Sequence, residues 1–329
     1  MSTHALAEYV RILARGKNAS RSMTQEEAYF TMTELLAGRF LPEQLGAILM
    51  LMRVKEESAE ELAGFAQAIN NLWPDDMPVD LIWASYAGKR RQPFWCFLSA
   101  LLVSQMGYRV LMHGTEAHTP NRMYMHQVFS AFQRPIIEHL HELSAPVALQ
   151  YLPCSTLTPT LQQWLLLKSV LGVRSPINTV LKTIAPTGIP SVQGVFHPNY
   201  RQVHAQAAQL THQRALIIKG EGGEFEVNPE RRCEAWLQDG EVTQYVHITS
   251  QQSHFDNKVN DISNVHLYQL WRGDVSNPYA IESVLNTAAL ALCAIEADKT
   301  LEQTRQSVEL AWRARDRDAL SKPLNDGLS

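Results

Sequence analysis

The sequence predicts an α/β protein with a small α-helical N-terminal subdomain and a larger α/β domain built on a largely parallel central sheet. The first 72 residues carry only helical periodicity, and the segment 73–80, with two prolines and three acidic residues, separates them from the rest. Beyond it, short apolar runs alternate with helical stretches, and the chain ends in two helical stretches at about 279–297 and 301–317. Strands that alternate with helices are typical of a parallel sheet with right-handed crossovers.

Four short helices are predicted in the first 72 residues. Apolar residues of the first helix recur at the spacing of one helical face: Leu6, Tyr9, Val10 and Leu13. Thr24 followed by Glu27, and Ser58 followed by Glu61, fit capping boxes that begin the second and fourth helices. Pro42 suits the first turn of the third helix. These helices make up the expected helical subdomain.

Apolar runs predict strands at 81–85, 109–113, 147–152 and 215–219, with a helix at 94–106 after the first strand. Two further helices, which begin at Pro159 and Pro176, interrupt this pattern, and we expect them to return to the helical subdomain. The predicted division therefore places 1–72 and about 159–185 in the helical subdomain. The ranges 80–158 and 190–329 form the α/β domain.

The composition is that of an ordinary globular protein, because 45% of the 329 residues are hydrophobic and 19% are charged. The net charge of -4 gives no bulk support for nucleic-acid binding, which would need a local cluster of Lys and Arg. The four cysteines lie far apart without a CxxC pair, which predicts reduced core thiols rather than a zinc site or disulfides. A signal-peptide pattern and a long continuous apolar run are both absent from the sequence, so we expect a cytoplasmic protein.

Several segments resemble one known family. They are "TQEEAYFTMTELLAGRFLPEQLGAILMLMRVKEESAEELAGFAQAI" in the N-terminal region, "HG" at 113–114, "LGVRSPIN" at 171–178 and "NTAALALCAIEADKTLEQ" near the C-terminus. Together they resemble anthranilate phosphoribosyltransferase, a family related to the pyrimidine nucleoside phosphorylases, over nearly the whole chain. The resemblance implies the fold of that family and a homodimer formed through the N-terminal helices.

The sequence departs from this family where the substrate phosphates and the metal would bind. The resemblance implies a GTGGD loop after the first strand, whose backbone N–H groups hold a pyrophosphate, but residues 85–91 read SYAGKRR. Met112 replaces the lysine of the KHG motif, and Phe225 replaces the aspartate of an Asp-Glu pair that binds magnesium, which leaves Glu226. One carboxylate is a poor magnesium site. We therefore expect no catalytic residue, no metal ligand and no cofactor, with magnesium only if the chain is nevertheless an enzyme.

A divergent branch of the family, the YbiB-like proteins, fits these departures better. The local resemblance lies in "RGKN" at 15–18, in "SYxGxR" at 85–90, in "HPxY" at 197–200 and in Lys182. It implies a homodimer that binds DNA or RNA without sequence preference, through contacts to the phosphate backbone. The predicted phosphate contacts are Lys89, Arg90, Arg91, Arg15, Lys17, Lys168, Arg174 and Lys182. The positions of the degenerate family site are Gly88, His113, Gly114, Asn178 and Glu226.

Other readings stay open at this point. A basic triplet in a loop is often only solvated, Lys168 and Arg174 are equally compatible with structural ion pairs, and a lone histidine such as His113 is usually a hydrogen-bonded structural residue. Retained family residues keep an active phosphoribosyltransferase or phosphorylase with an altered substrate as the main alternative. A scaffold or regulatory protein that uses the dimer surface is a third.

Overall fold

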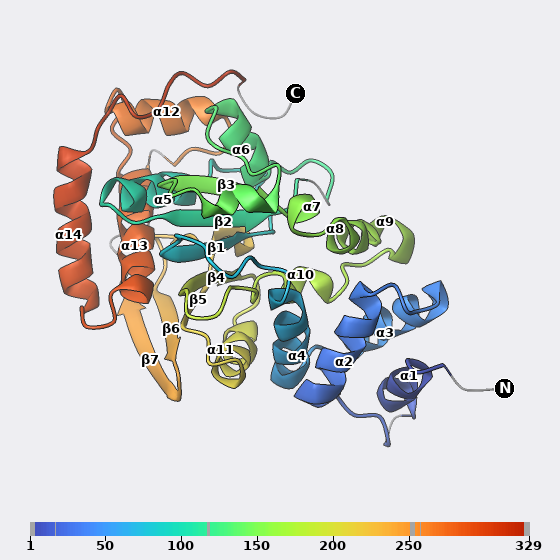
Figure 1. The fold of residues 1–329 in the computed structure, drawn as a ribbon. Helices are drawn as coiled ribbons and strands as arrows, with labels where there is room; N and C mark the ends of the chain where they lie inside the picture. Colours follow the sequence, from blue (N-terminus) through green and yellow to red (C-terminus); the bar gives the residue numbers. More distant parts are fainter. Residues whose placement is uncertain (1–3, 17, 117–118, 251–253, 257, 326–329) are drawn as a thin grey trace.

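The computed structural model describes residues 4–16, 18–116, 119–250, 254–256 and 258–325 (Figure 1). Its helices are α1 (Ala7–Ala14), α2 (Gln25–Leu36), α3 (Pro42–Lys55), α4 (Ala59–Asn70), α5 (Trp95–Gln105), α6 (Met125–Ala131), α7 (Cys154–Leu157), α8 (Pro159–Leu166), α9 (Lys168–Leu171), α10 (Ile177–Val180), α11 (Tyr200–Leu210), α12 (Asn264–Arg272), α13 (Pro278–Ile295) and α14 (Leu301–Ala314). Its strands are β1 (Leu81–Ser85), β2 (Val110–Gly114), β3 (Leu149–Pro153), β4 (Ser191–Val195), β5 (Ala215–Lys219), β6 (Cys233–Asp239) and β7 (Val242–Ile248).

The predicted fold class is confirmed, with a helical N-terminal region and a mostly parallel mixed sheet. The seven strands lie in the order β3-β2-β1-β4-β5-β6-β7, with parallel pairing from β3 to β5 and antiparallel pairing of β6 and β7. The predicted capping boxes at Thr24 and Ser58 are both present, with each hydroxyl accepting from the N–H three residues on. Helix starts were predictable because capping is a local property of the chain.

The two faces of the sheet pack against different helices. Leu81 and Trp83 lie in one apolar cluster with α5 and α13, whereas Ile82 and Ala84 lie in a second cluster with the N-terminal helices. Side chains of a strand alternate between the faces of its sheet, which explains the division. Figure 1 shows α13 and α14 on one side of the sheet and α1–α4 on the opposite side.

Helices α8 and α10 pack against the N-terminal region, and the predicted division into subdomains stays a prediction. The Trp164 ring of α8 lies edge-on to Phe40 with the ring centroids 6.1 Å apart, and α10 contacts α4. Helix α10 is only four residues long, which is shorter than the apolar residues after Pro176 suggest.

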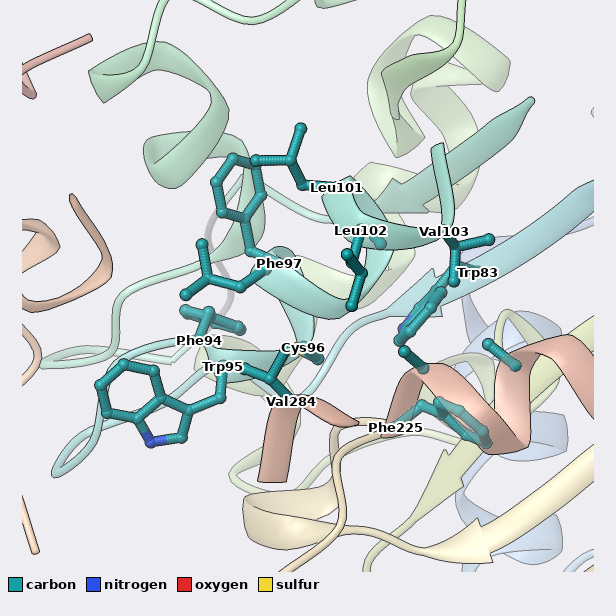
Figure 2. Packing of buried hydrophobic residues seen from close by; sticks show 14 of the residues in the cluster. Trp83, Phe94, Trp95, Cys96, Phe97, Leu101, Leu102, Val103, Phe225 and Val284 are labelled. Carbon is teal, nitrogen blue, oxygen red and sulfur yellow. The ribbon is translucent and has the colours of Figure 1, made fainter. Parts of the chain in front are cut away.

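The long apolar helix α13 is part of the core. Among the described residues it is the one helix long and apolar enough to cross a membrane, but most of it is buried in the protein. It packs against α5 and α14, and Val284 lies close to the aromatic residues of the core in Figure 2. All four cysteines are buried and free, as predicted for core thiols.

Candidate anion-binding cleft at the strand ends

The loop that follows β1 forms one wall of a cleft at the carboxyl ends of the parallel strands. Lys89 and Met123 pair as an isolated antiparallel bridge, with both N–H···O distances at 2.9 Å, which fixes the loop against the segment before α6. Gly88 has a φ of +69°, and a Cβ there would lie 2.8 Å from the Tyr124 ring. Open parallel sheets bind ligands at this edge, so the side chains gathered there are the candidates for function.

The Glu224 carboxylate accepts hydrogen bonds from two backbone N–H groups of this loop. Its Oε1 accepts from the N–H of Ala87 at 2.8 Å and from that of Gly88 at 2.7 Å, across 137 and 136 residues of chain. Two convergent backbone N–H groups are a typical anion site, and here the anion is a side chain of the same protein. Its Oε2 is buried and has no hydrogen-bond partner among the described residues.

Lys89 is buried in an ion pair. Its Nζ bonds to Oε1 of Glu226 and to the carbonyl of Pro93, while Oε2 of Glu226 accepts from the Cys96 N–H at 2.9 Å. The Lys89 side chain is only 4% exposed and that of Glu226 is fully buried. The expectation that Lys89 lies in an exposed loop and contacts phosphate is therefore corrected, because its ammonium points into the protein.

Lys182 is also buried. Its Nζ donates to the carbonyls of Gly194 and Gly223, at 2.7 Å and 2.8 Å. Burial, together with repulsion from Arg174 and Arg122, lowers the pKa of Lys182 to about 8, and attraction to Glu224 opposes this shift. Lys182 lines the base of a cavity, but two of its three N–H donors are used by the backbone. It is a structural cation in this arrangement rather than an exposed phosphate contact.

A second group of cations forms the rim of the cleft, and we call the five residues Arg90, Arg91, Arg122, Lys168 and Arg174 the cationic rim. Arg90 and Arg91 are exposed, whereas the other three are half-buried. In the part of the chain that the structure describes, none of the five forms an ion pair.

Four members of the cationic rim, Arg90, Arg122, Lys168 and Arg174, repel one another. Burial lowers the pKa of Lys168, and the charges that lower it further are those of Arg174, Arg122 and Arg90. The pKa of Arg174 is lowered by burial and then by Arg122, Arg90 and Arg53. Their hydrogen bonds are to neutral groups, for Lys168 and Arg174 contact Thr119 Oγ1 at 3.3 Å and 3.4 Å. Such a group of like charges costs free energy unless an anion binds it.

Arg122 was not predicted from the sequence. It donates to the carbonyls of Ala87 and Gly88, both at 2.8 Å, which places its guanidinium beside the loop after β1. The sequence around it, TPNRM, carries no motif that points to the cleft. Only the bridge between its neighbour Met123 and Lys89 brings it there.

Of the two remaining predicted basic residues, Arg15 lies elsewhere. Arg15 directly follows α1, which packs against α3, and it lines neither cavity at the strand ends. Lys17 lies outside the described residues.

Two cavities lie within this cleft. The first, of about 120 Å³, is lined by Arg53, Arg174, Ser175, Asn178, Thr179, Lys182, Val195, Phe196, His197, Tyr200 and His204. The second, of about 160 Å³, is lined by Gly88, Lys89, Arg90, Arg91, Gln92, Arg122, Phe196, Glu221 and Gly222. Phe196, which follows β4, lines both cavities.

The retained family positions have structural roles. His113 is buried and bonds through Nδ1 to the Tyr86 hydroxyl at 3.0 Å, and burial lowers the pKa of His113 to about 3. A Cβ on Gly114 would lie 2.0 Å from the Ser85 carbonyl oxygen, so the strand pairing itself requires glycine. Asn178 lines the first cavity, with Nδ2 at 3.5 Å from the Tyr86 carbonyl oxygen.

The residues at the strand ends do not fit a magnesium ion. Glu226 is neutralised by Lys89, and Phe225 points into the core, where its ring lies edge-on to Trp83 at 5.2 Å (Figure 2). Magnesium demands near-ideal octahedral geometry and is usually held by one or two carboxylates together with waters and substrate phosphates. The described residues also contain no group of three or more His, Cys, Asp or Glu side chains that could hold a metal.

Comparison with known proteins supports the resemblance drawn from the sequence. Residues 7–72 match the family model described as "Glycosyl transferase family, helical bundle domain". An uncharacterized protein of Escherichia coli K12, YbiB, is 28% identical over 68% of this chain and 72% of its own length. Anthranilate phosphoribosyltransferase of Aquifex aeolicus is 25% identical over 68% of both chains.

Solved structures agree over almost the full length. Anthranilate phosphoribosyltransferase from Thermus thermophilus superposes with a TM-score of 0.75 over 97% of this chain and 95% of its own, at 20% identity. The Saccharomyces cerevisiae enzyme, in complex with PRPP and Mg, gives a TM-score of 0.75 over 95% of this chain and 94% of its own, at 14% identity. At such identities the likeness establishes the fold. The predicted resemblance to an anthranilate phosphoribosyltransferase-like fold, with a divergent YbiB-like branch, is confirmed.

Proposed function

We propose that this chain, which has an anthranilate phosphoribosyltransferase-like fold, binds nucleic acid through the phosphate backbone and without sequence preference. The observation that carries the proposal is the cationic rim, whose five residues form no ion pair among the described residues and four of which, Arg90, Arg122, Lys168 and Arg174, repel one another. Phosphates are the anions that Lys and Arg neutralise at nucleic-acid interfaces. Contacts to phosphate alone fix position without reading sequence.

A polymeric anion suits the rim better than a single small one. The five cations come from the loop after β1, from the segment before α6, and from α9 with the loop that follows it. A chain of phosphates can contact all five cations at once, whereas a single phosphate has oxygens for only some of them. The net charge of -4 is compatible with this function because the basic residues are concentrated locally.

Two intramolecular contacts argue against phosphoribosyl transfer. Glu224 occupies the N–H groups of Ala87 and Gly88, in the loop where the family resemblance implies that a pyrophosphate binds. The Lys89 ammonium forms an ion pair with Glu226, the remaining member of the implied magnesium pair. Both ligands that the reaction would need are thus replaced by side chains of the protein, so we expect the chain to be inactive as a transferase.

The second candidate is an active phosphoribosyltransferase with an altered substrate, which the shared fold and the retained Gly114 and Asn178 favour. Two assays on the purified protein separate the candidates. Binding of a fluorescent oligonucleotide should weaken steeply as salt rises from about 50 to about 200 mM, and incubation with anthranilate, PRPP and Mg²⁺ should yield no phosphoribosyl anthranilate. Turnover at an ordinary enzymatic rate, or affinity independent of salt, would overturn the proposal.

We also propose a homodimer through the N-terminal helices. Support comes from the family resemblance of the N-terminal helices and from apolar side chains exposed in the same region, since Leu41 is 53% exposed and Val54 is 81% exposed. Exposed apolar residues in one region favour a protein interface. Light scattering should give twice the chain mass of 37.1 kDa, and a monomer at micromolar concentration would contradict the proposal.

A further inference from the structure

Phe196 is a large aromatic side chain that is 58% exposed and lines both cavities of the cleft. It directly follows β4, whose last residue, Val195, is buried, so the backbone below the ring is anchored in the sheet. The ring lies edge-on to His197, with centroids 5.0 Å apart and an interplanar angle of 80°. The position combines a rigid base with an aromatic ring open to solvent.

Cations line both of the cavities that this ring borders. Phe196 lines the first cavity together with Arg53 and Arg174, and it lines the second together with Arg90, Arg91 and Arg122. An aromatic ring shared by two cation-lined cavities matches the alternation of base and phosphate along a single strand. Proteins that bind single strands combine these two features, a cationic groove and aromatic rings on which bases stack.

We infer that Phe196 stacks on an unpaired base of a single-stranded nucleic acid, while the flanking phosphates bind Arg53 and Arg174 on one side and Arg90, Arg91 and Arg122 on the other. The inference rests on the proposed nucleic-acid binding and assigns its substrate class. In a duplex both faces of each base are already stacked, so the ring has no base to contact. Every base has a π-face, so the contact is compatible with binding that ignores sequence.

An exposed aromatic residue alone would carry no such conclusion, because single exposed apolar residues are common on protein surfaces. Tyr245 shows the difference. It is 57% exposed on β7, packs edge-on to Trp236 at 5.1 Å, and lines neither cavity. It therefore provides a matched control of equal exposure, outside the cleft.

The test compares two strands of equal length and charge. One is oligo(dT), and the other carries tetrahydrofuran in place of every base, so that only the phosphate backbone remains. Phe196→Ala should weaken oligo(dT) binding by about 5- to 150-fold, the equivalent of about 1–3 kcal/mol for one stacked base. Binding of the abasic strand should not change, and the slope of affinity against salt should be that of the parent.

Two control variants and one stability measurement accompany this test. Phe196→Trp should keep oligo(dT) affinity, Tyr245→Ala should bind both strands like the parent, and thermal unfolding by circular dichroism should confirm that Phe196→Ala is folded. If the parent binds neither strand at about 50 mM salt, the proposed function itself fails. If the parent binds both strands equally and Phe196→Ala alters neither, or weakens both alike, only the stacking inference is overturned.

Discussion

Charged side chains have different roles in the interior and at the rim of the strand-end cleft. In the interior, the charges of Lys89 and Glu226 compensate each other, and the backbone compensates Glu224. At the rim, Arg90 and Arg91 continue the same loop but have no carboxylate partner in the described part of the chain. The interior charges hold the loop in place, and the rim charges remain available to a ligand.

The local geometry explains the division of the basic triplet. Lys89 pairs with Met123 in an extended bridge, so its side chain and that of Arg90 point to opposite sides. One residue is thereby buried and the next exposed. Substitutions in the interior should change stability with little effect that is specific to binding, and substitutions at the rim should do the reverse.

The largest expected effect is that of Lys89→Met. The change removes the ammonium and leaves the Glu226 carboxylate fully buried, with the Cys96 N–H still donating to it. Breaking a buried ion pair in this way costs about 3–5 kcal/mol, so the midpoint of urea unfolding should fall sharply. The double variant Lys89→Met/Glu226→Leu removes both charges and should recover most of that loss. Identical midpoints for Lys89→Met and the parent would mean that the ion pair does not stabilise the fold.

The interior was the part of the site that sequence could not predict. The Lys89–Glu226 pair and the Glu224 contacts each join residues more than 130 positions apart, and no local pattern encodes them. The same holds for Arg122, which reaches the cleft through a backbone bridge. By contrast, the helix starts, the strand at 81–85 and the exposed Arg90 and Arg91 follow from capping, apolar runs and loop position, which are local.

The strands that sequence analysis did not find also have a physical explanation. β4 reads SVQGV and has no continuous apolar run, although all five residues are buried. β7 is an edge strand with mostly exposed residues, and β6 alternates between buried and half-buried residues over much of its length. Their pairing in the sheet gives them their structure, and that pairing is tertiary information.

The next effect concerns acid stability and the buried His113. Burial lowers the pKa of His113 to about 3, so its contribution to stability is fully present above its ordinary pKa near 6.5 and is lost as the pH falls toward 3. At about pH 5 the loss is about 2 kcal/mol, from about 1.4 kcal/mol for each pH unit. His113→Asn should reduce the difference in unfolding free energy between about pH 7 and about pH 5, measured in urea at each pH.

The difference between the two pH values is the informative quantity, because His113→Asn also shortens a buried side chain and lowers stability at every pH. His212→Asn changes an exposed histidine and serves as the control. If both variants show the same pH dependence as the parent, His113 is not held neutral by the interior of the cleft.

A change at the rim should affect binding and leave stability intact. Arg90→Ala/Arg91→Ala removes two expected phosphate contacts, so the slope of log affinity against log salt should flatten by about 1.4–1.8. Between about 50 and about 200 mM salt the fall in affinity would then be about 7- to 12-fold smaller than for the parent, as measured by fluorescence anisotropy. Exposed substitutions of this kind cost within about 0.5 kcal/mol, so the urea midpoint should stay close to that of the parent. An unchanged salt slope would remove these two residues from the proposed interface.

The smallest expected effect lies at the margin of the first cavity, where Tyr200 donates to Glu57 Oε2 at 2.6 Å and links the N-terminal helices to α11. Burial raises the pKa of Glu57, with the Tyr200 hydrogen bond opposing the shift. A carboxyl group with a raised pKa contributes stability that is present below its ordinary pKa of 4.5 and is lost as the pH rises through the raised value. Glu57→Gln cannot ionise, so it should lose less stability than the parent as the pH rises from about 4.5 to about 8. Tyr200→Phe removes the opposing hydrogen bond, so the loss of stability with rising pH should be steeper in that same range.

Parallel curves of unfolding free energy against pH for Glu57→Gln and the parent would show that Glu57 does not titrate in this range. The Tyr200–Glu57 contact would then stabilise the fold equally across this range, like the ion pair of Lys89 with Glu226.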